Sequence, residues 1–141
     1  MKIRIKKIHP DAKTPRYAHD GDAGMDVFAC EKTRVPAGGR AMVPTGIAME
    51  IPKGYVGLVW DKSGLAMKKG LKTIGGVIDA GYRGEILIGI ANMTRDDYVF
   101  EKGDKVAQIL IQKVEAPELE EAEELSDTAR GAGGFGSTGK A

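Results

Sequence analysis

Short apolar runs separated by glycine and proline extend along most of this chain of 141 residues. The apolar runs are residues 2–6, 25–29, 47–51, 55–60, 85–91 and 106–114. The turn signals between them are residues 36–39, 44–46, 52–54, 75–76 and 103–104. Strands at this spacing favour a β-sandwich, a jelly roll or a barrel, so we expect an all-β fold.

One segment departs from this pattern, at residues 63–69 (SGLAMKK). Leucine, alanine, methionine and lysine are good helix formers, and Ser63 is of a type favoured at a helix N-cap. Gly70 follows as a C-terminal stop signal. We therefore expect one short helix here. The charged run at residues 118–125 is interpreted as a solvated connector.

Composition limits the partners that suit this chain. The 21 basic and 20 acidic residues nearly cancel, which is not the footprint of a protein that binds a nucleic-acid duplex. Cys30 is the only cysteine, so we interpret it as a small buried side chain and expect no internal disulfide. The first residues do not resemble a signal peptide, and no apolar run is long enough to span a bilayer. We expect a soluble cytoplasmic protein with no nucleic-acid or membrane partner.

The C-terminal part of the chain, residues 130–139 (RGAGGFGSTG), is half glycine. Glycine loses the most backbone freedom on ordering, so such a segment becomes ordered on a ligand or not at all. Its other groups suit a nucleotide, because Phe135 offers a flat face for a planar ring and Arg130 a planar fork for phosphate. The further anion donors are the backbone of Gly136 and the hydroxyls of Ser137 and Thr138. The alternative, which composition alone favours, is a flexible linker or disordered tail.

Residues 75–86 (GGVIDAGYRGEI) combine a short apolar pair with turn signals around Asp79. We expect a β-hairpin in which residues 77–78 form one strand, residues 80–81 the turn, and the chain from Tyr82 onward the returning strand. Such a hairpin can present backbone N–H and C=O groups to the edge of a base while its carboxylate points at a reacting centre. The alternative is an aspartate that stabilises only its own turn.

Other polar residues suit an anion or a cation. Lys62, Ser63 and Gly64 lie where the expected helix begins, and a hydroxyl, an open backbone N–H and the helix dipole there favour an anion. An ordinary serine cap beside a surface lysine is the alternative. Residues 22–26 (DAGMD) hold two carboxylates, which could support a cation but do not make a metal cage. Gln108 lies in an apolar strand, where a buried amide needs a partner.

Several of these segments occur in one order along the chain: residues 22–26 (DAGMD), 61–66 (DKSGLA), 76–84 (GVIDAGYRG), 103–108 (GDKVAQ) and 130–139. In this order they resemble the motifs of the trimeric dUTP pyrophosphatases (dUTPases), and the resemblance covers nearly the whole chain. It implies a jelly-roll catalytic domain at residues 1–127, a flexible lid at residues 128–141, and a homotrimer whose active sites are built from several chains. It also implies hydrolysis of dUTP to dUMP and pyrophosphate, which limits uracil incorporation into DNA and supplies dUMP for thymidylate synthesis.

The resemblance implies roles for single residues around the base and sugar. Asp79 would be the general base that activates a water for attack on the α-phosphorus. Tyr82 would pack under the deoxyribose and leave no room for a 2′-hydroxyl. The backbone of Gly76, Val77 and Ile78 would read uracil, and the tight fit would exclude the methyl group of thymine.

The resemblance also implies a phosphate end of the site. Its phosphate-binding residues would be Lys62, Ser63, Gly64 and Gln108 from the body of the protein and Arg130, Gly136, Ser137 and Thr138 from the tail. Phe135 would stack on uracil. Mg²⁺ would be bound chiefly through the triphosphate, without a direct protein ligand, and Asp26 would act through water.

Some positions depart from the family pattern. Lys62 and Lys105 stand where the family usually has arginine, which keeps the charge but loses the bidentate fork. Trp60-Asp61 precedes Lys62, where proline is common. Thr73, the remaining candidate substrate-binding residue, stands where many bacterial members have asparagine, so a side-chain contact with uracil is left open here.

Two other functions compete with this one. The related dCTP deaminases share the fold but need a carboxylate on the strand after residues 76–84, where this chain has Gly89. They also usually have phenylalanine where Tyr82 stands. A non-catalytic nucleotide-sensing module is the alternative from another class, and the presence of both Asp79 and the tail argues against it.

Overall fold

The computed structural model describes residues 1–136 and 138–139. These residues form strands and one short helix, α1 (Ser63–Lys69). The strands are β1 (Arg4–Lys7), β2 (Met25–Phe28), β3 (Thr33–Val35), β4 (Arg40–Pro44), β5 (Ile47–Glu50), β6 (Tyr55–Trp60), β7 (Leu71–Ile74), β8 (Val77–Ile78), β9 (Leu87–Asn92), β10 (Tyr98–Phe100) and β11 (Lys105–Lys113). Each apolar run singled out from the sequence overlaps a strand, so the expected all-β class is confirmed.

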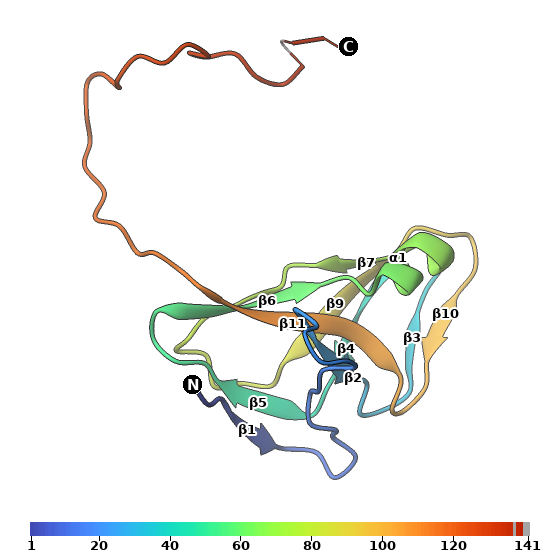
Figure 1. Cartoon of the computed structure of the whole chain (residues 1–141). Coiled ribbons are helices and arrows are strands. Elements are labelled where there is room, and N and C mark those ends of the chain that lie inside the picture. Colours follow the sequence, from blue (N-terminus) through green and yellow to red (C-terminus); the bar gives the residue numbers. More distant parts are fainter. Residues whose placement is uncertain (137, 140–141) are drawn as a thin grey trace.

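All strand pairs are antiparallel and build two larger and two smaller sheets (Figure 1). The four-stranded sheet has the order β2-β11-β6-β8, and the three-stranded sheet has the order β4-β9-β7. Strand pairs β1-β5 and β10-β3 complete the body. The arrangement is a jelly roll, in which strands that are neighbours in sequence often belong to different sheets.

One apolar core lies between the larger sheets. It joins Val27 and Ile109 of the four-stranded sheet to Ile88 and Ile90 of the three-stranded sheet. Buried and more exposed side chains alternate along β9. Since successive side chains of a strand point to opposite faces, one face of β9 packs into this core. Cys30 is also buried, as expected, and burial raises the pKa of its thiol, so it is not a reactive nucleophile.

The predicted helix has the expected bounds but not the expected cap. Its N-cap is Lys62, whose carbonyl accepts the first helical bond from Ala66, and no side chain caps the helix. Ser63 is the first helical residue, so its prediction as the N-cap is wrong. Gly70 ends the helix in the left-handed region, with φ 64°, and its N–H donates to the carbonyl of Leu65.

The predicted β-hairpin around Asp79 is wrong. β8 pairs with β6, whereas the next strand along the chain, β9, pairs with β4 and β7 in the other larger sheet. Asp79 begins a turn that the N–H of Tyr82 closes by donating to the carbonyl of Asp79 at 3.1 Å. The segment from Asp79 to β9 is therefore a crossing between sheets, and Tyr82 lies in the crossing rather than in a strand.

The chain leaves the body after β11 and extends away from the sheets (Figure 1). The N–H of Val114 still donates to the carbonyl of Gly54 at 3.0 Å. Beyond it, the hydrogen bonds of the described residues are local, such as that from Nε of Arg130 to the carbonyl of Gly133 at 2.6 Å. Within the described part of the chain, no helix combines the length and apolar character needed to cross a membrane.

Candidate active site

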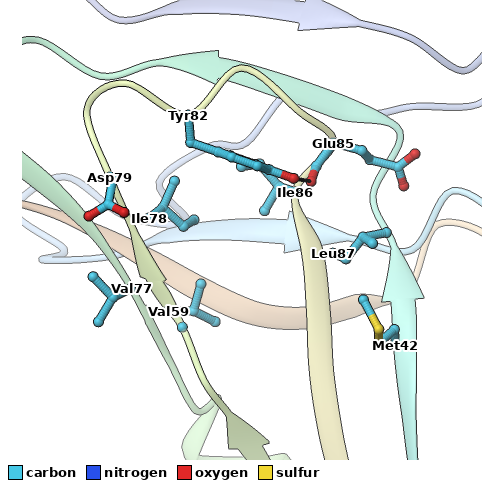
Figure 2. A pocket seen from close by; sticks show the side chains of 10 residues that line it. Met42, Val59, Val77, Ile78, Asp79, Tyr82, Glu85, Ile86 and Leu87 are labelled. Atoms are coloured by element: carbon cyan, nitrogen blue, oxygen red, sulfur yellow. Dashed lines mark hydrogen bonds between the residues drawn. The ribbon is translucent and has the colours of Figure 1, made fainter.

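Asp79 and Tyr82 lie together at a hollow of about 270 Å³ between the two larger sheets. Its lining residues are Met42, Val59, Gly76, Val77, Ile78, Asp79, Tyr82, Glu85, Ile86 and Leu87. Figure 2 shows the ring of Tyr82 extending across the hollow above Ile86, with the carboxylate of Asp79 at one end and Met42 at the other. The structure thus brings the expected general base and the expected sugar-packing ring to one cavity.

The ring of Tyr82 is held in place from two sides. Its hydroxyl donates to the carbonyl of Glu85 at 2.8 Å (Figure 2). Gly84 lies against the ring, because a Cβ at Gly84 would be 2.5 Å from the hydroxyl oxygen of Tyr82. The ring is nevertheless 45% exposed, so one face remains open to the hollow. A fixed and open aromatic face suits a sugar ring that must fit closely.

Residues 76–78 supply an open backbone edge beside this ring. β8 is the last strand of its sheet, so the side that does not face β6 has unpaired backbone groups. Gly76 is needed where β8 approaches β6, since its φ is 109° and a Cβ there would lie 3.0 Å from the carbonyl oxygen of Val59. A free strand edge can donate to and accept from the edge of a base, as the sequence predicts for uracil.

Ser63 and Gln108 line a second hollow of about 440 Å³. Its other lining residues are Ala23, Trp60, Asp61, Ala66, Met67 and Leu110. The amide Nε2 of Gln108 donates to the backbone carbonyl of Asp61 at 2.9 Å, so this partly buried amide has the partner that the sequence predicts for it. Gly64 faces open space, because a Cβ built on it has no neighbour within 4 Å. The structure thus brings two of the four expected phosphate-binding residues of the body, Ser63 and Gln108, to this second hollow, whereas Lys62 and Gly64 do not line it.

Asp26 holds two lysines beside that hollow. Its side chain is 3% exposed, and its oxygens lie 2.5 Å from Nζ of Lys62 and 2.9 Å from Nζ of Lys105. Burial alone would raise the pKa of the Asp26 carboxyl, but the hydrogen bonds and charges of the two lysines outweigh it and lower that pKa. Two ammonium groups share one carboxylate, so the cluster keeps a net positive charge that suits an anion.

The same contacts weigh against a metal cage around Asp26. Both of its carboxylate oxygens already have an ammonium partner. The other carboxylate of this segment, Asp22, accepts a hydrogen bond from the N–H of His19 at 2.9 Å. Within residues 1–136 and 138–139, no three histidine, cysteine or acidic side chains are grouped to hold a metal ion. Both carboxylates of this segment are therefore already engaged within the chain.

Replacing Asp26 by asparagine should destabilise the protein in a pH-dependent way. At pH 7 the two lysines would lose their anion, so the free energy of unfolding should fall by about 2 kcal/mol, less than the roughly 3–5 kcal/mol of fully buried pairs because the lysines are partly solvated. The folded pKa of Asp26 lies below its usual 3.8, so its contribution is present above that pH and disappears as the pH falls through the folded value.

Urea unfolding of wild type and Asp26→Asn at pH 7 and pH 3 checks this expectation. The difference between the two proteins should be largest at pH 7 and smaller at pH 3. Asp22→Asn is the matched control, because that carboxylate is on the surface and should change stability by less than about 0.5 kcal/mol. Equal stability of wild type and Asp26→Asn at pH 7 would contradict the role given to the ion pairs.

Thr73 is buried, and both of its donors are occupied within the chain. Its N–H and its hydroxyl donate to Oδ1 of Asp61 at 2.7 and 2.8 Å. Thr73 also borders a third hollow of about 190 Å³ together with Gly76 and Val77. The sequence indicated Asp61 only as a departure from a motif; its contacts with Thr73 could not be found from the sequence, because the residues are twelve positions apart.

The described tail residues are not brought to either hollow. Phe135 is fully exposed, and Arg130 bonds only within the tail. Gly136 and Thr138 line neither hollow, and Ser137 lies outside the described residues. The hollow with Asp79 and the hollow with Ser63 also have no lining residue in common. One chain therefore holds the expected site residues in separate groups.

The structure argues against a deaminase carboxylate at Gly89. This residue lies in β9 opposite Ile74 of β7. A Cβ at Gly89 would be 2.8 Å from Cγ1 and 2.9 Å from the carbonyl oxygen of Ile74. Glycine thus allows a close approach of two strands here, and an acidic side chain would require both to move.

Comparisons with known proteins agree with this geometry. The family model described as dUTPase matches residues 10–139. The chain is 46% identical to a deoxyuridine 5'-triphosphate nucleotidohydrolase of Thermobifida fusca, covering 99% of this chain and 79% of the relative. It is 44% identical to the protein of that name from Paramecium bursaria Chlorella virus 1, covering 97% of each.

Solved structures give the same result. The dUTPase of Staphylococcus bacteriophage 80alpha, solved with dUpNHpp, superimposes with a TM-score of 0.92 at 32% identity over 99% of each chain. A variant of the dUTPase from phage phi11 of S. aureus, studied for the coordination of a structural Mg(II) ion, superimposes with a TM-score of 0.83 at 30% identity, covering 88% of this chain and 98% of the other. With this fold, these motifs and these relatives, the chain belongs to the dUTPase family.

Proposed function

We propose that this protein hydrolyses dUTP to dUMP and pyrophosphate. The observation that carries the proposal is the group formed by Asp79, the held ring of Tyr82 and the free edge of β8 at one hollow. The phage 80alpha dUTPase, which has the same fold, was solved with the nucleotide analogue dUpNHpp. A base-reading edge, a sugar platform and a carboxylate in one cavity are what hydrolysis of a nucleotide at its α-phosphorus needs.

The chemistry assigned to Asp79 is that of a general base. Its carboxylate accepts a proton from a water molecule, and the oxygen of that water forms a bond to the α-phosphorus. The bond from the α-phosphorus to the bridging oxygen breaks, and pyrophosphate leaves with that oxygen. In phosphoryl transfer, positioning and charge stabilisation matter more than a strong nucleophile, so an exposed aspartate at the correct place is sufficient.

The phosphate end is assigned to the second hollow and its rim. Ser63, Gly64 and Gln108 supply uncharged donors, and Lys62 and Lys105 supply the positive charge. We expect Mg²⁺ to enter with the substrate, bound chiefly through the triphosphate, as the family resemblance implies. Asp26 then acts by orienting the lysines, and any contact with the ion goes through water.

A homotrimer with sites shared between chains explains the separation of the two hollows. Met42, Val77 and Leu87 border the Asp79 hollow and are 62%, 69% and 42% exposed. Such an exposed apolar rim suits coverage by a second copy of the chain. The tail, residues 128–141, acts as the lid that brings Phe135 and Arg130 to a bound nucleotide. The cytoplasm is the location that we assign to this enzyme.

Replacing Tyr82 by alanine should weaken the discrimination between dUTP and UTP. The ring is held by Glu85 and Gly84, so it cannot retreat from a 2′-hydroxyl. We expect the ratio of kcat/KM for dUTP to that for UTP to fall by about 10-fold or more. Tyr82→Phe is the comparison, because it keeps the ring beside Gly84 and loses only the hydrogen bond to Glu85, so its ratio should fall less than that of Tyr82→Ala. An unchanged ratio in Tyr82→Ala would remove this residue from sugar selection.

Release of pyrophosphate from dUTP, dCTP, dTTP and UTP with Mg²⁺ tests the proposed function directly. Fast release from dUTP alone is the expected result. Release from none of the four nucleotides would contradict hydrolysis, and release of ammonia from dCTP would show a deaminase instead.

A further inference from the structure

Asp61 connects β7 with the strand that carries Gln108. It lies between β6 and α1, at the start of the DKSGLA segment. Its Oδ1 accepts hydrogen bonds from the N–H and the hydroxyl of Thr73, at 2.7 and 2.8 Å. Its Oδ2 lies 2.9 Å from Nζ of Lys72. The side chain of Asp61 is thus held by two successive residues of β7.

The backbone of Asp61 is occupied on the other side, by Gln108. Its carbonyl accepts the hydrogen bond from Nε2 of Gln108 at 2.9 Å. The amide of Gln108 is also confined by Gly24, because a Cβ at Gly24 would be 2.4 Å from Oε1 of Gln108. The orientation of this amide therefore depends on where the carbonyl of Asp61 lies.

These contacts join the two larger sheets. β7 is an edge of the three-stranded sheet, whereas β6 and β11 are neighbours in the four-stranded sheet. Burial alone would raise the pKa of the Asp61 carboxyl, but the N–H of Thr73, the ammonium of Lys72 and the hydroxyl of Thr73 outweigh it and lower that pKa. A carboxylate that stays charged makes stronger hydrogen bonds than a neutral group would.

We propose that Asp61 and Thr73 form a positioning pair for Gln108, and that Thr73 acts through Asp61 rather than by contact with the base of the nucleotide. The proposal rests on the proposed function, in which Gln108 binds phosphate. It joins two departures from the family pattern, at Trp60-Asp61, where proline is common, and at Thr73, where many members have asparagine, into one hydrogen-bonded unit. The N–H and the hydroxyl of Thr73 both donate to Asp61, so neither is free to donate to a base.

The test compares ligands with and without phosphate groups. Thr73→Val keeps the shape of the side chain but removes the hydroxyl, and Thr73→Ser keeps the hydroxyl and is the matched control. Dissociation constants are measured for dUpNHpp with Mg²⁺ and for deoxyuridine, which has a base and sugar only. Thr73→Val should weaken binding of dUpNHpp by about 5-fold and Asp61→Ala by on the order of 10-fold, because each variant removes hydrogen bonds that hold the carbonyl of Asp61 in place for Gln108, and a factor of 10 corresponds to about 1.4 kcal/mol. Thr73→Ser should bind like wild type, and deoxyuridine should bind equally to all the proteins.

A double-mutant cycle separates positioning from general loss of structure. In a Gln108→Leu background, Thr73→Val should no longer change the affinity for dUpNHpp, because the group that it positions is gone. An effect of Thr73→Val that persists in this background would overturn the proposal. Weaker binding of deoxyuridine to Thr73→Val would also overturn it, since that result indicates a direct contact with the base.

The proposed function and the positioning pair can be tested independently of each other. If the wild-type protein releases no pyrophosphate from dUTP, the proposed function is wrong, whatever the variants bind. If wild type hydrolyses dUTP and binds dUpNHpp but Thr73→Val binds this analogue equally well, the positioning pair is wrong and the function stands.

Discussion

Asp79→Asn should reduce kcat for dUTP by about 10²–10⁴-fold while the affinity for dUpNHpp changes by less than about 3-fold. Asparagine keeps the size of the side chain but cannot accept the proton of the attacking water. The turn that holds this residue uses the backbone carbonyl of Asp79, which accepts from the N–H of Tyr82 at 3.1 Å, so the exchange leaves the turn intact. Pyrophosphate release gives kcat, and calorimetric titration with dUpNHpp gives the affinity.

Asp20→Asn is the control for this experiment. Its carboxylate is exposed and borders neither the hollow of Asp79 nor the hollow of Ser63, so kinetics and binding should match those of wild type. A kcat of Asp79→Asn within about 3-fold of wild type would remove Asp79 from the role of base. A parallel loss of binding would instead assign it to holding the nucleotide.

The sequence predicts the longer strands better than any other part of the fold. β6 and β11 are mostly apolar runs that each follow a glycine turn, and the structure pairs them along most of their length. The sequence does not predict β4 and β7, because these strands are only five and four residues long, RAMVP and LKTI, and neither shows a clear alternation of apolar and polar residues. Such segments become strands because β9 lies between them and supplies hydrogen bonds to both.

The error at Asp79 has a different origin. A pair of apolar residues, a glycine turn and a second apolar run are typical of a hairpin, and sequence proximity favours pairing of the two runs. In the structure the first run, β8, completes the sheet of β6, and the second run, β9, fills the centre of the other sheet. Which sheet a strand joins depends on partners far away in the chain, so local pattern does not determine it.

The candidate site could be predicted as a set of residues but not as an arrangement. Resemblance indicated Asp79, Tyr82, Ser63 and Gln108 by their motifs. It did not indicate that Asp26 binds Lys62 and Lys105, or that Asp61 binds Thr73, because these contacts join segments of different motifs. The residues that depart from the family pattern thus contact one another or Asp26 across the chain: Lys62 and Lys105 pair with Asp26, and Asp61 pairs with Thr73.

Deleting residues 130–141 should leave a folded protein that hydrolyses dUTP on the order of 10² times more slowly. The N–H of Val114 bonds to Gly54, and the described residues beyond Val114 form only local hydrogen bonds, so the body does not depend on the tail for its stability. Without the tail, a bound nucleotide would lose the donors that Arg130 and Thr138 are expected to supply, and bulk water would reach the reacting phosphate. The melting temperature of the truncated protein should stay within about 2 °C of wild type.

Phe135→Ala distinguishes stacking from simple coverage. The tail of this variant keeps its glycines and Arg130, so a loss close to that of the deletion would assign most of the effect of the lid to the ring. Phe135→Trp is the matched control, because a larger aromatic face can also stack on a base and should preserve most of the activity. Since the ring is fully exposed and contacts nothing in the body that could hold it there, its contribution can come only from an ordered state formed on the nucleotide. Kinetics of the truncated protein equal to those of wild type would rule out a lid, and Phe135 would then belong to a tail without a role in hydrolysis.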